Sequence, residues 1–183
     1  MSFMAALVRG INVGGKSVKM DRLAASFEAL GFTNVSTYIQ SGNVVFKGRV
    51  SGTGTVAARI AARIRRDFGF DVAVLLRSAT ELAGISEHNP LAKSEGLDPA
   101  WLHVTFLAEK APASAAEILA PLAGPGERVH VMGREVYLYC PGGYGNTKLS
   151  NGAIEKKLGL FATTRNWKTV GILCEMTGGT VVR

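Results

Sequence analysis

The side chains best suited to chemistry in this chain are basic and amide groups in three short segments. The first, Leu7-Val-Arg-Gly-Ile-Asn-Val-Gly-Gly-Lys16-Ser17, follows an apolar run near the N-terminus. The second, Gln40-Ser-Gly-Asn43, joins two β-like runs, and the third, Thr163-Thr-Arg-Asn-Trp-Lys-Thr169, opens an amphipathic stretch. Guanidinium, ammonium and amide groups donate hydrogen bonds to anions. The three segments therefore predict a site that favours negative charge.

The first segment also matches a phosphate-binding P-loop. Residues 10–17 fit the literal pattern G-x-x-x-x-G-K-[ST] and stand between a predicted strand and a predicted helix. Against a P-loop NTPase, the helical pattern begins only near Met20 or Asp21, and the next two strands read as an antiparallel hairpin. No apolar strand ends in the aspartate that would help to hold magnesium. We interpret the segment as an anion-binding loop on another fold, with an NTPase and a ligand-free connection as alternatives.

The other two segments allow a structural and a functional interpretation. Gln40, Ser41 and Asn43 suit the fixing of a ligand, but Ser-Gly-Asn is also ordinary turn chemistry. We expect this turn and the glycine loop at opposite ends of the sheet. Arg165 and Asn166 are expected at the start of a terminal helix capped by Thr163 or Thr164, where the helix dipole favours anions. They form half of a phosphate site or tie the two halves of the chain together.

A basic stripe is a further candidate. Arg59, Arg63 and Arg66 recur at i, i+4 and i+7, opposite the apolar positions of the same predicted helix. Such a stripe indicates a solvated helix face or a surface for nucleic acid. The strands lack the aromatic pattern of an RNA-recognition sheet, which favours the solvated face.

Composition limits the remaining classes of function. The chain has 183 residues, 47% of them hydrophobic, and a net charge of +7. This is globular composition with a bias toward anionic partners. Two cysteines and three scattered histidines indicate neither a disulfide framework nor a metal site, and the residues identify no cofactor. No apolar run reaches membrane-spanning length and no signal peptide is recognisable, so we expect a cytoplasmic protein without a membrane partner.

The periodicity predicts an α+β fold of two tandem ferredoxin-like subdomains. Strand and helix patterns alternate as β-α-β-β-α-β in the first half, and the same order recurs in the second half. Such a plait has an antiparallel sheet with both helices on one face. The expected subdomains are residues 1–86 and residues 97–183, the second with an additional terminal helix.

The same segments resemble a bacterial family, the domain of unknown function 1697. The resemblance rests on residues 7–16, Lys19-Met20, Gly31-Phe32 and residues 37–46, and later on residues 102–107, Lys148-Leu149 and residues 163–170. It implies two ferredoxin-like subdomains and no particular reaction. The segments and the resemblance together suggest these residues for a shared anion site: Arg9, Asn12, Lys16, Lys19, Gln40, Ser41, Asn43, Lys148, Arg165 and Asn166.

The function that these observations favour is the binding of a phosphate-bearing small molecule or a nucleotide in a basic cleft between the subdomains. Arg9 and Arg165 are expected to face this cleft together. The alternatives are a nucleic-acid-binding module, a P-loop NTPase, and a protein whose motifs only dock its two halves. Substrate, reaction and oligomeric state do not follow from the sequence.

Overall fold

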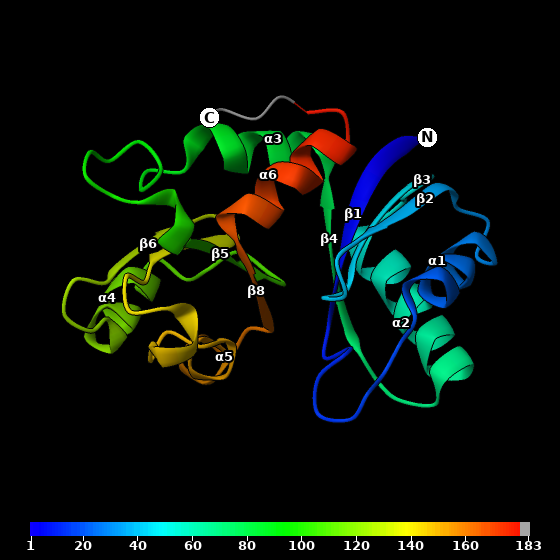
Figure 1. The fold of residues 1–183 in the computed structure, drawn as a ribbon, viewed down its shortest axis with the longest axis horizontal. Coiled ribbons are helices and arrows are strands. Elements are labelled where there is room, and N and C mark those ends of the chain that lie inside the picture. Colours follow the sequence, from blue (N-terminus) through cyan, green and yellow to red (C-terminus); the bar gives the residue numbers. More distant parts are fainter. Residues whose placement is uncertain (180–183) are drawn as a thin grey trace. The chain divides into compact units, whose positions relative to one another are not determined.

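The protein has a mixed α/β fold with two four-stranded antiparallel sheets (Figure 1). The computed structural model describes residues 1–179. It divides into two compact units, Met1–Gly84 together with the segment from Leu173 onward, and Ile85–Ile172. The expected subdomain bounds, residues 1–86 and residues 97–183, stay a prediction.

The first sheet has the strand order β2-β3-β1-β4, and every neighbouring pair is antiparallel. Its strands are β1 (Ser2–Arg9), β2 (Thr33–Tyr38), β3 (Asn43–Gly48) and β4 (Ala73–Ser78). Helices α1 (Met20–Glu28) and α2 (Thr53–Phe68) contact each other and cover one face of this sheet (Figure 1). The unit has the predicted β-α-β-β-α-β order and is consistent with a ferredoxin-like subdomain.

The core of this unit fills the space between sheet and helices. Leu23 and Phe27 of α1 and Ile60 of α2 are fully buried in one cluster with alternate residues of the strands. The other face of β1 is buried too, because Ala5 and Leu7 have no exposed surface. Successive side chains of a strand point to opposite faces, so both faces of this sheet are shielded from water around β1.

One geometric expectation was wrong, because the glycine loop and the β2–β3 turn lie at the same end of the sheet. β1 and β3 are antiparallel with Leu7 opposite Asn43, so the end of β1 adjoins the start of β3. The backbone N–H of Val8 donates to the oxygen of Gly42 at 2.8 Å. The crossover of α1 makes β2 run in the same direction as β1, which puts the following turn beside the end of β1.

The P-loop alternative is also wrong. The strand that leads into Gly10–Ser17, β1, pairs antiparallel with both of its neighbours, β3 and β4, whereas a P-loop fold requires parallel neighbours. Gly14 and Gly15 have φ values of 58° and 83°, and Lys16 N–H donates to the Val13 oxygen at 3.2 Å. The two glycines thus form a tight turn. Lys16 and Ser17 precede α1 and take no part in its first turn.

The second unit repeats the arrangement with strand order β6-β7-β5-β8, again antiparallel throughout. Its main elements are β5 (Leu102–Leu107), α4 (Ala115–Leu119), β6 (Arg128–Met132), β7 (Glu135–Tyr139), α5 (Asn151–Leu158) and β8 (Ala162–Asn166). The predicted hairpin around Gly133 is present. The weak last strand that the sequence suggested near residues 159–164 is β8, slightly further along the chain.

Two further helices complete the described part, α3 (Ala79–His88) and α6 (Trp167–Met176). Short 3₁₀ turns are η1 (Pro99–Trp101), η2 (Ala120–Leu122) and η3 (Tyr144–Asn146). Among residues 1–179, no helix combines the length and the apolar character needed to cross a bilayer.

Candidate functional site

Asn12 joins the glycine loop to the β2–β3 turn. Its side-chain oxygen accepts from Val18 N–H at 2.7 Å, and its Nδ2 donates to the backbone oxygens of Val18 at 3.2 Å and Gln40 at 2.8 Å. An asparagine amide has two donor hydrogens, so both are used within the protein. The backbone of Asn12 has a φ of 54°, a conformation that asparagine tolerates better than most residues. The structure therefore gives Asn12 a loop-closing role.

The β2–β3 turn is held by the polar residues that the sequence suggested as ligands. Asn43 is fully buried, and its Nδ2 donates to the Tyr38 oxygen at 3.2 Å and to Ser41 Oγ at 2.8 Å. Gln40 is exposed and contributes its backbone oxygen to the bond from Asn12. These contacts support turn chemistry for Gln40, Ser41 and Asn43, and a ligand role for them stays a prediction.

The basic residues of the first segment lie apart along it. Lys16 Nζ is 3.4 Å from the backbone oxygen of Asp71 and 5.3 Å from the centroid of the Phe70 ring, so it joins the glycine loop to the segment before β4. Arg9 ends β1 as predicted, and Lys19 is exposed immediately before α1. The expectation that Arg9 and Arg165 share one cleft concerns residues of different units and stays a prediction.

The third segment differs from the expectation in its helix start. Thr163, Thr164, Arg165 and Asn166 belong to β8, and α6 begins at Trp167. Asn166 caps this helix, because its Oδ1 accepts from the N–H of Thr169 at 2.8 Å. The predicted cap at Thr163 or Thr164 is thus wrong. The local reason is that both threonines are paired with β5 in the sheet ladder.

Arg165 is a buried strand residue. Its Nη1 donates to Thr163 Oγ1 and to the backbone oxygen of Thr164, both at 2.8 Å. Burial lowers the pKa of the guanidinium to about 10, which leaves it charged at neutral pH. A buried charge of this kind is costly to leave without its partners. Replacement of Arg165 would leave the Thr163 hydroxyl and the Thr164 carbonyl without this donor, so we expect it to affect stability, and a ligand role for Arg165 stays a prediction.

Thr164 is the centre of a hydroxyl network in the second unit. Its Oγ1 donates to Asn151 Oδ1 at 2.7 Å, accepts from Tyr144 OH at 2.9 Å, and lies 2.7 Å from Thr105 Oγ1. The Tyr144 ring stacks on His103 with centroids 4.9 Å apart. A hydroxyl has one donor and two acceptor positions, so Thr164 is satisfied by these three groups. The network joins α5, β5 and β8 to the loop that carries Tyr144.

The structure supports no metal or thiol chemistry in the part that it describes. Residues 1–179 contain no group of three His, Cys, Asp or Glu side chains that could hold an ion. Cys140 and Cys174 are buried and form no disulfide. Burial raises the pKa of Cys140 to about 11 and also raises that of Cys174. Neither thiol is therefore poised as a nucleophile at neutral pH.

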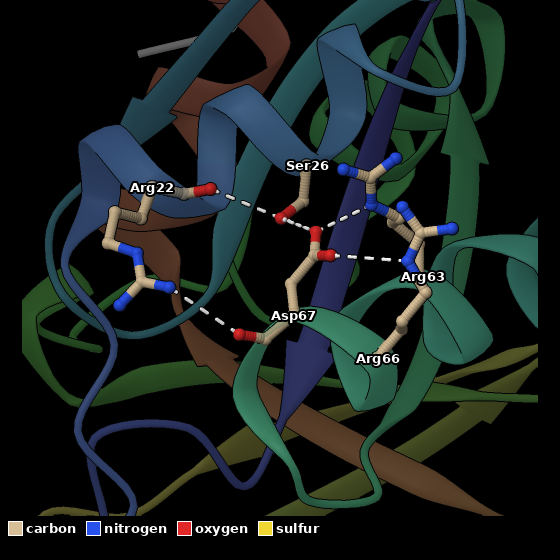
Figure 2. A network of polar contacts seen from close by, with 5 residues as sticks. All are labelled: Arg22, Ser26, Arg63, Arg66 and Asp67. Carbon is tan, nitrogen blue, oxygen red and sulfur yellow. Dashed lines mark hydrogen bonds and ion pairs between the residues drawn. The ribbon is translucent and has the colours of Figure 1, made fainter.

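A polar network between α1 and α2 gathers arginines around one carboxylate (Figure 2). Asp67 Oδ2 accepts from Arg63 Nε at 2.5 Å and from the Ser26 hydroxyl at 2.7 Å, while Oδ1 lies 3.7 Å from Arg66 Nε. Arg22 Nη2 lies 3.5 Å from the Asp67 backbone oxygen. The Ser26 hydrogen bond and Arg63 lower the pKa of Asp67. Two guanidinium groups thus contact the carboxylate, and that of Arg22 contacts the backbone of the same residue.

This network borders a pocket of about 210 Å³ on the helical face of the first unit. The polar side chains that line it are Arg22, Ser26, Arg63 and Asp67, and Phe68 forms an aromatic wall. The Arg22 guanidinium lies over the Phe68 ring, 5.1 Å from its centroid, which holds the charge beside the pocket. The pocket thus presents two guanidinium groups and one carboxylate beside an aromatic ring.

The basic stripe that the sequence suggested is only partly a solvated face. Arg59 and Arg66 are exposed, but the Arg63 side chain is only 20% exposed and is paired with Asp67. The exposed Arg65 pairs with Asp71 at 3.3 Å. The stripe therefore supplies two exposed cations, and its middle member belongs to the network between the helices.

Positive charge is concentrated in the first unit. Residues 1–84 contain eleven lysines and arginines against five acidic residues, whereas residues 85–172 contain nine against eight. The net charge of the chain thus comes almost entirely from the half that carries the Arg22 and Arg63 pocket. A long-range field that attracts anions would originate there.

Sequence reasoning missed the residues of this pocket. The Arg63–Asp67 spacing of i and i+4 was a readable signal for an ion pair on one helix. Arg22 and Ser26 carried no comparable signal, because their role depends on α1 packing against α2. Of the residues that were suggested, Lys148 borders a separate cavity in the second unit.

Comparisons with known proteins agree with the architecture described above. The model of the family "Protein of unknown function (DUF1697)" matches residues 1–137, and the chain belongs to this family. A solved structure of similar fold is that of the conserved bacterial protein SP0830 from Streptococcus pneumoniae, with a TM-score of 0.68 and 23% sequence identity over 96% of this chain and 98% of that chain. A search of curated proteins gave no match.

Proposed function

We propose that the protein binds a phosphate-bearing small molecule or nucleotide, and that the pocket between α1 and α2 receives the phosphate. The observation that carries this proposal is the pair of guanidinium groups, Arg22 and Arg63, that line one pocket. Arginine donors in a planar fork match phosphate oxygens, and their hydrogen bonds are charge-assisted. The excess of basic residues in the same unit supports the proposal.

Both arginines keep donors available for a ligand. Arg63 uses Nε for Asp67, and its two Nη groups form no hydrogen bond within residues 1–179. Arg22 makes a long contact through Nη2 and lies over the Phe68 ring. Its Nε and Nη1 groups are therefore available to donate to a ligand. Asp67 acts as a positioning residue, because its carboxylate accepts hydrogen bonds from both Arg63 and Ser26. An anion would complete the hydrogen bonding of both guanidinium groups.

The size of the pocket limits what it accepts. Pockets that enclose a small organic ligand usually measure about 300–1,000 Å³. At about 210 Å³ this one suits a single phosphate group, so the rest of the ligand lies outside it. Affinity would then depend on the phosphate, with weak selectivity for the attached group.

Calorimetric titration with pyrophosphate, ATP and adenosine tests the proposal. We expect pyrophosphate and ATP to bind and adenosine not to bind. Arg22→Ala should weaken both phosphate ligands by about tenfold or more, the usual value of a charge-assisted hydrogen bond. Arg65→Ala is the matched control, because Arg65 has the same charge but pairs with Asp71. Equal binding of ATP by the wild-type protein and Arg22→Ala would refute the proposed site.

A second candidate, nucleic-acid binding, is favoured by the exposed arginines Arg59 and Arg66 on α2. A phosphodiester strand that contacts Arg59, Arg66 and Arg22 would have about three of its phosphates neutralised. The affinity for single-stranded RNA should then fall with salt with a logarithmic slope of about −2. If the affinity for RNA does not depend on salt, or if RNA does not bind, this second candidate is wrong and the small-molecule proposal remains. Charge reversal in this test should spare Arg63, because it is bonded to Asp67.

A further inference from the structure

We infer that the second unit contains a separate binding site for a small apolar molecule that carries one acidic group. The site is a cavity of about 330 Å³ between the end of η2 and the loop before α5. This volume lies within the range of pockets that enclose small organic ligands. The cavity differs in place and in lining from the pocket between α1 and α2.

One wall of the cavity is apolar and is formed by Pro121, Leu122, Ala123 and Pro125. Two of these residues are prolines, whose fixed backbone gives a surface that loses little entropy on binding. Such a wall favours the apolar part of a ligand through the removal of its surface from water. These four side chains contribute no hydrogen bonds, so the orientation of a ligand depends on the polar residues of the lining.

The polar part of the lining is held in place by Glu127. Its Oε2 accepts from Gly124 N–H at 2.8 Å and from Thr147 Oγ1 at 2.9 Å, so it joins the loop at residues 124–127 to the loop that carries Thr147. Asn146 is fixed as well, because its Nδ2 donates to the Gly142 oxygen at 2.7 Å. The cavity is therefore prepared without a ligand.

Lys148 supplies the charge that selects the ligand. It lines the cavity, is exposed, and has no ion pair or hydrogen bond within residues 1–179. Although Glu127 lines the same cavity, it forms no ion pair with Lys148 within residues 1–179, so the ammonium group is available to an acidic group of a ligand. A monoanion with an apolar body matches both the ammonium group of Lys148 and the apolar part of the lining.

Two matched probes test this site, 1-naphthoate and its neutral analogue 1-naphthamide. We expect 1-naphthoate to bind and to shift the backbone amide resonances of Gly124, Gly142 and Thr147 in a ¹H–¹⁵N spectrum. The amide should bind about tenfold more weakly, since it lacks the charge that pairs with Lys148. Equal affinity for the two probes, binding of neither, or shifts confined to the first unit would overturn the inference.

Two variants separate the two walls. Lys148→Ala should lower the affinity for 1-naphthoate about tenfold and leave that for 1-naphthamide unchanged. Lys156→Ala, an exposed lysine on α5, is the matched control and should bind as the wild type does. Ala123→Phe fills the cavity from the apolar wall and should weaken both probes. If Lys148→Ala and Ala123→Phe both fold and bind 1-naphthoate normally, the cavity is not the site.

Discussion

The Nδ2 group of Asn12 donates to the backbone oxygen of Gln40 across 2.8 Å, so two segments with strong sequence patterns are bonded to each other. The residues are 28 positions apart and belong to the loop after β1 and the turn after β2. Polar residues at loop ends suggest a ligand site when only the sequence is considered. Here the backbone of a neighbouring loop takes the place of that ligand.

The first prediction concerns Asn12. Asn12→Ala removes three hydrogen bonds and leaves the partners of the amide unsatisfied, so we expect a loss of about 2–3 kcal/mol in the free energy of unfolding. Asn34→Ala is the matched control, because Asn34 also has a positive φ, 50°, without a comparable long-range contact. It should lose about 1 kcal/mol, the cost of the left-handed conformation. Urea unfolding of both variants measures the difference, and equal losses would contradict a loop-closing role.

The second prediction concerns Gly42 in the β2–β3 turn. A Cβ atom at this position would lie 2.4 Å from the backbone oxygen of Val8, and the φ is 78°. Gly42→Ala should therefore lower the free energy of unfolding by about 3 kcal/mol or more, since β1 cannot move away without breaking its sheet hydrogen bonds. Gly15→Ala has a similar φ of 83° but open space around the new atom, and should cost only about 1 kcal/mol. A thermal-unfolding comparison in which Gly42→Ala is the milder variant would disprove the close approach.

The surroundings of Gly42 and Asn12 show which features of the fold the sequence predicted and which it did not. Periodicity predicted the order of strands and helices, because alternating and helical apolar spacing depend on local geometry. It did not show that the glycine loop and the β2–β3 turn share one end of the sheet. Nor did it show that Asn12 bonds to the backbone of Gln40, since an amide suits many partners.

The third prediction concerns the dependence of stability on pH. The pKa of Asp67 in the folded protein is lowered from its ordinary value of 3.8 by Ser26 and Arg63. A lowered pKa stabilises the fold fully above about pH 5, and this contribution is lost as the pH falls through the folded-state value. The free energy of unfolding of the wild type should exceed that of Asp67→Asn by about 1–2 kcal/mol at neutral pH. This difference should narrow below about pH 4.

Urea unfolding at several pH values measures this gap. Asp71→Asn is the control, because Asp71 and Arg65 form an exposed pair with side chains 79% and 69% exposed. Exposed pairs contribute about 0–1 kcal/mol, so this variant should differ little from wild type throughout. A gap for Asp67→Asn that stays constant through acid pH would mean that its carboxylate is not stabilised by the network between α1 and α2.

The fourth prediction concerns Arg165 in β8. Arg165→Ala removes a buried guanidinium and leaves its partners Thr163 and Thr164 without a donor, so we expect a loss of about 2–3 kcal/mol in the free energy of unfolding. Lys168→Ala removes an exposed charge nearby and should change stability by about 0.5 kcal/mol or less. Unfolding curves of the two variants give the comparison. If Arg165→Ala is as stable as wild type, its guanidinium does not support the strand.

The pocket between α1 and α2 illustrates the part of the site that the sequence could not indicate. The Arg63–Asp67 pair follows from helical spacing alone. The addition of Arg22 and Ser26 requires the packing of α1 on α2, which depends on the shared core around Phe27 and Ile60. The basic stripe was therefore recognised, but Arg63 was assigned to the solvent and not to a carboxylate.

The most direct test of phosphate binding observes the arginine side chains themselves. Each guanidinium Nε–H group gives its own NMR resonance, which can be followed during titration with pyrophosphate. We predict that the resonances of Arg22 and Arg63 shift and saturate with one dissociation constant, equal to the value from calorimetry, while Arg65 stays unchanged. A uniform small drift of all arginines, or saturation at arginines other than Arg22 and Arg63, would contradict the proposed function of this pocket.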